Sequence, residues 1–146
     1  MSQEISPLPW DSPEFYLQAH AVAAARLKFV EHKGKRILTI NCVQTDFQLL
    51  KAIAAEVFHV VSSHQPKSVR TLIDVEGAEF NSESVSLASE LAAKNRPYVL
   101  RGAVIGVKGM RYFAFQTVIS FSKRPMKLFE NRLEALDWLA LDGEAK

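Results

Sequence analysis

The stretch that decides the fold is residues 69–95, VRTLIDVEGAEFNSESVSLASELAAKN. It begins with an apolar run over residues 70–75, which is typical of a buried strand. A turn rich in carboxylates and hydroxyls follows, where Asn81 or Ser82 can cap a helix by accepting hydrogen bonds from its first N–H groups. We expect that helix to end at Asn95. Its apolar positions are Val85, Ala88, Leu91 and Ala92.

The chain before this unit predicts an N-terminal arm and a β-hairpin. Residues 1–23 contain several prolines in their first part, which interrupt regular structure, so we expect a loosely docked arm. Segments 26–31 and 36–43 are rich in Val, Ile, Leu and Phe, and the turn between them contains Gly34, which can adopt a positive φ. The main domain is therefore expected at residues 24–146.

The other segments alternate between helical and strand patterns. Thr45 and Gln48 have the spacing of a capping box, and apolar residues then recur at helical spacing as far as Ser63. The further elements expected are a helix over 46–63, a strand over 98–107, a third helix over 108–121, a strand over 126–129 and a last helix that starts at Asn131.

Strands that alternate with helices imply right-handed crossovers onto a mostly parallel sheet, and the hairpin adds an antiparallel pair. We therefore predict a small α/β domain with a mixed, mostly parallel five-stranded sheet and four helices. The expected core residues are Leu38, Ile40, Ile53, Val57, Ile73, Leu91, Val104, Ile105, Val118, Leu136 and Leu139.

Composition narrows the class of protein. The chain has 146 residues, of which 48% are hydrophobic, so it can bury a core as a single domain. Cys42 is the only cysteine, which excludes an internal disulfide and suits a reducing compartment. The first residues lack the pattern of a signal peptide, and no apolar run approaches the roughly 20 residues of a spanning helix. We expect a cytoplasmic protein without a membrane span.

Charge is distributed unevenly, although the formal net charge is only +2. Residues 74–90 contain acids and no Lys or Arg, whereas residues 94–132 are mainly basic. Neither set forms the contiguous run that marks nucleic-acid-binding tails. We expect no nucleic-acid partner, and the charges indicate either solvated faces or a surface for an anion or an acidic partner.

Two motifs carry a resemblance to a known family. Residues 72–84, LIDVEGAEFNSES, resemble the STAS pattern of a strand, Asp, Gly and Phe, and then Ser before a helix. Residues 129–139, FENRLEALDWL, resemble the closing strand and helix of SpoIIAA-like proteins. The resemblance extends over about residues 26–141 and is closest to the uncharacterised SpoIIAA-like branch, which is linked by fold to lipid-binding CRAL-TRIO domains.

The resemblance implies a regulatory use of the turn. In anti-sigma-factor antagonists of this fold, a serine at the start of the helix is phosphorylated by a kinase that is also the binding partner. By position, Ser84 or Ser82 would be that phosphoacceptor, at the positive end of the helix dipole. The same serines can serve only as helix caps.

The turn could alternatively bind a hard cation such as Mg²⁺, because such cations prefer oxygen ligands such as carboxylates. The carboxylates available to it are Asp74, Glu76, Glu79 and Glu83. No ligand-loop spacing is recognisable, so we favour the absence of a metal and of any cofactor.

Enzyme motifs are not recognisable in the sequence. The four histidines are scattered and form no HExxH or Ser/His/Asp arrangement, and the glycines at 102, 106 and 109 form no phosphate-binding loop. Carboxylates at the turn could perform acid–base work only if burial shifted their pKa values. We therefore predict a protein that is not an enzyme.

The third expected helix is apolar on two sides. Met110, Phe113 and Val118 lie on the face expected to cover the sheet, whereas Tyr112, Phe115 and Ile119 lie on another. The second face needs a cover. We favour a homodimer interface there, with a partner protein, an apolar ligand or the arm at 1–23 as the alternatives.

Two classes of function follow. The first is a non-enzymatic, STAS-like regulatory or protein-interaction module that uses the turn and is controlled by serine phosphorylation. The alternative is a carrier or sensor of a small apolar ligand or lipid that uses the third helix. The turn surface comprises Asp74, Glu76, Gly77, Glu79, Asn81 and Glu83.

Overall fold

The computed structural model describes residues 8–122 and 126–142. Its helices are α1 (Pro13–Ala23), α2 (Phe47–Val61), α3 (Ser82–Asn95), α4 (Arg111–Ser122) and α5 (Arg132–Leu139), with a short 3-10 turn η1 (Ala24–Arg26). Its strands are β1 (Leu27–His32), β2 (Lys35–Asn41), β3 (Val69–Asp74), β4 (Val99–Ile105) and β5 (Met126–Phe129). The strands and the four helices that the sequence predicted are confirmed.

The five strands form one sheet in the order β1-β2-β3-β4-β5. β1 pairs with β2 in antiparallel fashion, and each later neighbouring pair is parallel. The hairpin turn places Lys33 and Gly34 at positive φ, which suits the right-handed twist of the two strands. The mixed, mostly parallel sheet is therefore as predicted.

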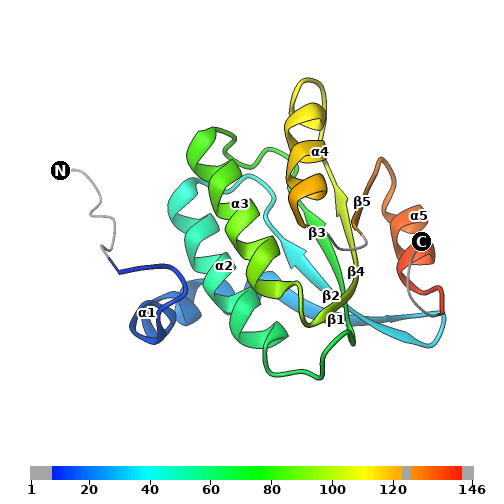
Figure 1. The fold of residues 1–146 in the computed structure, drawn as a ribbon, viewed down its shortest axis with the longest axis horizontal. Helices are drawn as coiled ribbons and strands as arrows, with labels where there is room; N and C mark the ends of the chain where they lie inside the picture. Colours follow the sequence, from blue (N-terminus) through cyan, green and yellow to red (C-terminus); the bar gives the residue numbers. More distant parts are fainter. Residues whose placement is uncertain (1–7, 123–125, 143–146) are drawn as a thin grey trace.

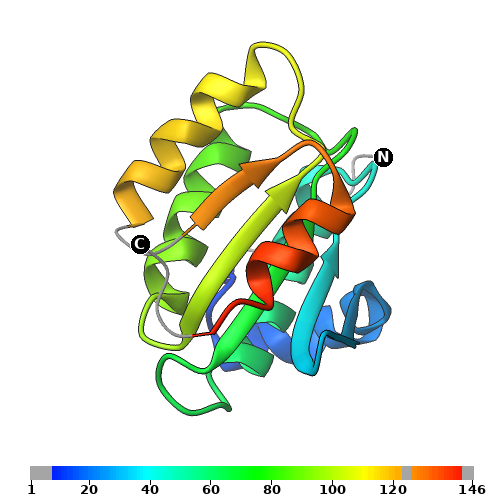
Figure 2. The same ribbon diagram turned by 90° about the vertical axis from the view of Figure 1, so that its right-hand side faces the viewer.

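The helices cover the sheet unequally. α2, α3 and α4 lie on one face and α5 lies on the other (Figures 1 and 2). The strands follow one another in sheet order, so right-handed crossovers place the three connecting helices on the same side. α5 comes after the last strand and returns across the opposite face, where it contacts β3, β4 and β5.

The predicted core is largely confirmed. The buried members are Leu38, Ile40, Ile53, Val57, Val104, Ile105 and Leu139. Ile73, Leu91 and Leu136 are partly buried against the same clusters. The side chain of Val118 lies outside the described part of the structure.

The segment before the hairpin is packed rather than loosely docked. Ser12 caps α1 by accepting a hydrogen bond of 3.2 Å from the Phe15 N–H, and Pro13 occupies the start of the helix. Phe15, Ala19 and Ala23 are buried in the main core. This helix packs against α2, so the alternative in which the arm covers the third helix is wrong for the described residues.

Two local predictions have different outcomes. Asn81 caps α3, as expected, through a hydrogen bond of 2.9 Å from Ser84 N–H. The capping box at Thr45 and Gln48 is wrong, because Asp46 caps α2 by accepting from Leu49 N–H at 2.9 Å. The Thr45 hydroxyl instead donates to the Cys42 carbonyl at 2.8 Å.

Candidate functional site

The turn after β3 is fixed by its neighbours. Gly77 adopts a φ of 70°, which a residue with a side chain rarely tolerates. The Gln44 N–H donates to the Glu76 carbonyl at 2.8 Å, and the Glu79 N–H donates to the Thr45 carbonyl at 2.7 Å. The turn is therefore held against the loop that connects β2 to α2.

The acidic side chains of the turn point to separate partners. Asp74 lies 3.5 Å from Arg132, and Glu76 lies 3.4 Å from Lys108. Glu79 accepts a hydrogen bond of 2.8 Å from the Phe47 N–H, at the start of α2. Within residues 8–122 and 126–142, no three His, Cys, Asp or Glu side chains are grouped to hold a metal ion. The structure does not support a magnesium site at these carboxylates.

The two candidate serines have different environments. Ser84 is buried, and its hydroxyl donates to the Asn81 carbonyl at 3.0 Å and accepts from the Asn81 N–H at 2.9 Å. This reciprocal arrangement with the Asn81 side chain is a capping box. Ser82 is exposed and is the first residue of α3. A modifying enzyme can therefore reach the hydroxyl of Ser82 more readily than that of Ser84.

A groove of about 670 Å³ lies next to the turn, at the carboxyl ends of β3, β4 and β5. Gly106 brings the next loop against the turn, since a Cβ at this position would lie 2.6 Å from the Glu76 nitrogen. The groove is lined by acidic, basic and aromatic side chains. They include Asp74, Glu76, Lys108, Tyr112, Phe113 and Glu130.

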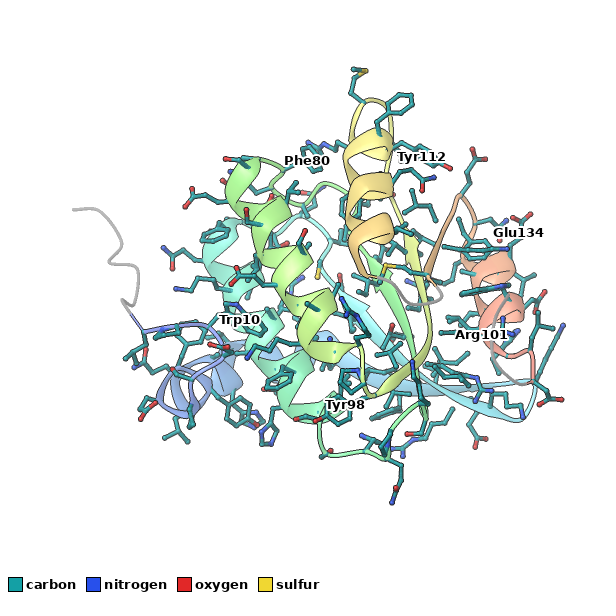
Figure 3. All side chains as sticks on the ribbon, in the orientation of Figure 1. Trp10, Phe80, Tyr98, Arg101, Tyr112 and Glu134 are labelled. Atoms are coloured by element: carbon teal, nitrogen blue, oxygen red, sulfur yellow. The ribbon has the colours of Figure 1, made fainter. Side chains whose placement is uncertain are left out.

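Large apolar side chains stand exposed at the start of α4. Met110 is 83% exposed and Phe113 is 69% exposed. Tyr112 packs edge-on against Phe113, with 6.2 Å between the ring centroids. Figure 3 shows Tyr112 at the same end of the molecule as Phe80, which lies in the turn before α3. Apolar side chains and the acidic turn thus share one end of the sheet.

The structure places the predicted apolar interface differently. Phe115 is half-buried, with its ring 6.1 Å from that of Phe80, and Ile119 is also half-buried. Tyr112 alone of the three is exposed, together with Met110 and Phe113, which the sequence had assigned to the inner face. A helix that is apolar on two sides gives no clear sequence signal for which side faces the sheet.

The histidines serve structural contacts away from the groove. His20 lies 2.8 Å from the buried carboxylate of Glu56, and His32 lies 2.6 Å from Asp137. His59 stacks on Tyr16, with 4.0 Å between ring centroids, and His64 donates to the Val60 carbonyl at 2.8 Å. None of the four lines the groove.

Comparison with known proteins defines the fold. No protein-family model and no curated protein matches the sequence. A solved structure of an uncharacterized DUF3478-family protein with a SpoIIAA-like fold, from Shewanella loihica PV-4, is similar over 78% of this chain and 92% of its own, with a TM-score of 0.62 and 19% identity. An anti-sigma-factor antagonist (STAS) domain protein from Planctomyces limnophilus is similar over 79% of this chain and 98% of its own, with a TM-score of 0.54 and 18% identity.

These similarities show that the chain has the SpoIIAA-like, or STAS, fold, as its motifs indicated. With sequence identities below one fifth, these similarities support an assignment of fold but not of activity. Across the described residues, the helices are too short or too polar to cross a membrane.

Proposed function

We propose that this chain is a non-enzymatic regulatory module that binds a partner protein at the carboxyl ends of its strands. The docking surface consists of the turn at 76–84, the loop at 106–110 and the first residues of α4. The observation that carries the proposal is the exposure of Met110 and Phe113 beside the groove. Burying apolar side chains of this size on a partner contributes roughly 1.5 to 3 kcal/mol each.

The charge around these side chains indicates the chemistry of the partner. Glu76, Glu83 and Glu130 are exposed on or beside the groove, and Lys108 is already paired with Glu76. The rim is therefore more acidic than basic. A partner with an apolar anchor surrounded by Lys or Arg would complement it, and its association rate would fall as salt rises.

If a partner binds through this surface, a substitution on the surface should remove that partner, and a substitution elsewhere should not. In quantitative capture from native lysate, the enriched protein should be lost with Phe113→Asp, because the anchor is removed and a charge is added. Leu17→Asp is the matched control, since Leu17 is similarly exposed on α1. Retention of the partner by Phe113→Asp, or an equal loss with Leu17→Asp, would contradict the proposal.

We also propose that Ser82, rather than Ser84, is the phosphoacceptor. Its exposed position at the first residue of α3 would place a phosphate near free N–H groups and the positive end of the helix dipole. Peptide mapping of protein from native cells should find a phosphate on Ser82 that is lost in Ser82→Ala and kept in Ser84→Ala. A phosphate on Ser84, or none on either serine, would refute this assignment.

A second copy of the chain is the other occupant we consider. The sequence favoured a homodimer through α4, and the exposed residues Met110, Tyr112 and Phe113 are the ones that such an interface would bury. Light scattering coupled to gel filtration should then give a dimer for the wild type and a folded monomer for Phe113→Asp. A monomeric wild type would eliminate the homodimer and leave the surface to a different protein.

A further inference from the structure

A second, inner site lies between the sheet and its helical layer. A partly open cavity of about 120 Å³ is lined by residues of β2, β3, β4, α2, α3 and α4. Its wall is mainly apolar and includes Ile53, Val57, Leu91, Val104, Phe80 and Phe115. Small residues create the space, since Ala54 of α2 and both Ala88 and Ala92 of α3 face it. Larger side chains at these positions would fill the cavity and improve packing.

Two buried side-chain oxygen atoms in this wall have no hydrogen-bond partner among the described residues. Thr71, in the middle of β3, is 2% exposed, and Asn95, at the end of α3, is 3% exposed. Both line the cavity. Neither the Thr71 Oγ1 nor the Asn95 Oδ1 has a hydrogen-bond partner within the described part of the chain. Each such group costs about 1–3 kcal/mol, and more than about 90% of buried polar groups in proteins are paired.

We propose that this cavity binds a small, neutral, mainly apolar molecule that carries one hydroxyl group. The size follows from the volume, because a cavity of about 150 Å³ holds a benzene-sized molecule. The hydroxyl group of the ligand is inferred from the two unpaired oxygen atoms in the cavity wall. The Asn95 oxygen requires a donor, and the Thr71 hydroxyl can donate or accept.

The neutrality of the ligand follows from the charged groups nearby. Glu79 and Arg111 are the charged side chains among the lining residues. Glu79 is occupied by the Phe47 N–H and by the Asn81 side chain at 2.9 Å, and Arg111 donates to the Ala78 carbonyl at 3.4 Å. A charged ligand would therefore be buried without a free counter-ion, at a cost of several kcal/mol.

The bound molecule would also touch the elements that carry the docking surface. Phe80, in the turn, and Phe115, on α4, both line the cavity. Their ring centroids are 6.1 Å apart, and the guanidinium of Arg111, also on α4, lies 5.4 Å from the Phe80 ring. Occupancy of the cavity would thus fix the turn relative to α4, although the ligand site does not depend on a partner protein being bound there.

Benzyl alcohol and toluene are suitable probes, and calorimetry with thermal unfolding is the measurement. Both probes should bind the wild type and raise its unfolding temperature. Ala88→Leu should abolish binding because the added side chain occupies the cavity. Ala93→Leu, the same change at an exposed position of α3, should leave binding within about twofold, as expected for a surface substitution. Absence of binding to the wild type, or equal binding by Ala88→Leu, would overturn the proposal.

The hydroxyl preference has a separate test. Thr71→Val removes the unpaired oxygen and preserves the size of the side chain. The ratio of the benzyl alcohol affinity to the toluene affinity should fall about tenfold in this variant, as expected for the loss of one buried hydrogen bond. Toluene binding by Thr71→Val shows that the cavity is intact. An unchanged ratio would overturn the assignment of a hydroxylated ligand.

Discussion

The two faces of the sheet are closed by different means. α2, α3 and α4 cover one face, and yet a cavity of about 120 Å³ remains between this layer and the sheet. α5, with 8 residues, covers part of the other face, and Ile37, Leu72 and Ala103 of the cluster on that face are at most 1% exposed. More helix therefore does not mean tighter packing, because the side chains that face the sheet decide how the space is filled.

Polar contacts hold the short helix in place. Arg101 is 4% exposed and donates to the Trp138 carbonyl at 3.1 Å, and its guanidinium lies 4.9 Å from the Trp138 ring. Arg70 donates to the Leu141 carbonyl at 3.2 Å. Cationic side chains near the C-terminal end of a helix can donate hydrogen bonds to its free carbonyls, and they interact favourably with the negative end of its dipole. Figure 3 shows Arg101 beside α5.

The hairpin adds a further set of contacts to this face. Asp137 of α5 lies 2.6 Å from His32 and 3.1 Å from Lys33. Lys35 lies 2.6 Å from Asp142, just after the helix. The face under α5 is thus specified by charged groups from distant parts of the chain, whereas the opposite face depends on apolar contacts around an internal space.

The largest expected difference in stability between the two faces comes from replacing a leucine by alanine on each of them. Leu139→Ala should lower the free energy of unfolding by about 2–5 kcal/mol, because Leu139 is fully buried and leaves a new cavity. Leu91→Ala should cost about 1–2 kcal/mol, since Leu91 is only partly buried and borders an existing cavity. Urea unfolding of both variants measures the difference. Equal losses would show that the two faces are packed alike.

Arg101 tests whether the contacts at the end of α5 need a guanidinium. Arg101→Lys keeps the charge but cannot reproduce both the stacking on Trp138 and the bond to its carbonyl. We expect a loss of about 1–3 kcal/mol in chemical unfolding, typical of a hydrogen bond to a charged group. Arg132→Lys is the control, because Arg132 is about half exposed, and it should change stability by less than about 0.5 kcal/mol. A neutral Arg101→Lys would show that charge alone suffices.

Acid should weaken the α5 face. Hydrogen bonds from His32 and then Lys33 lower the pKa of the Asp137 carboxyl, and a hydrogen bond from Lys35 lowers that of Asp142. A lowered folded pKa gives stability that is fully present above the unfolded value of about 3.9 and is lost as pH falls through the folded value. Thermal unfolding between neutral pH and about pH 2 should therefore be less acid-sensitive in Asp137→Asn/Asp142→Asn than in the wild type. Parallel pH profiles would refute this contribution.

Cys42 reports on the opposite face without changing stability. Burial raises the pKa of its thiol to about 12, so the reactive thiolate is scarce in the folded protein. Alkylation by iodoacetamide at pH 8 should be slower than for a free cysteine by on the order of a thousandfold, and urea should restore the ordinary rate. Intact mass measures the reaction over time. Rapid labelling in the native state would mean that the cavity wall opens readily.

Local sequence signals predicted much of the chain correctly. Asn81 and Asn131 both cap helices, because a cap depends on residues only three positions apart. The alternating order of strands and helices also predicted the parallel crossovers correctly. Thr45 does not cap α2 because its hydroxyl donates to the Cys42 carbonyl, three residues earlier in the same loop, and the adjacent Asp46 caps the helix instead.

The candidate site was predicted only in part. The sequence identified the turn and the two serines, but it could not distinguish the buried hydroxyl of Ser84 from the exposed Ser82. It also could not decide which aromatic residues of α4 would face outwards, since that helix is apolar on two sides. Residues 13–23 gave a further error, because the prolines nearby obscured a helix that packs against α2.

By itself, the sequence determined the elements from the hairpin onwards, their order and the sheet that they form, because these depend on periodicity and on contacts between near neighbours. Only the tertiary structure decided that Arg101 lies under α5, that Met110 and Phe113 are exposed, and that Thr71 and Asn95 share a cavity. Each of these depends on how side chains from distant segments fill a common volume. That outcome is set by packing between elements and leaves no pattern within any one of them.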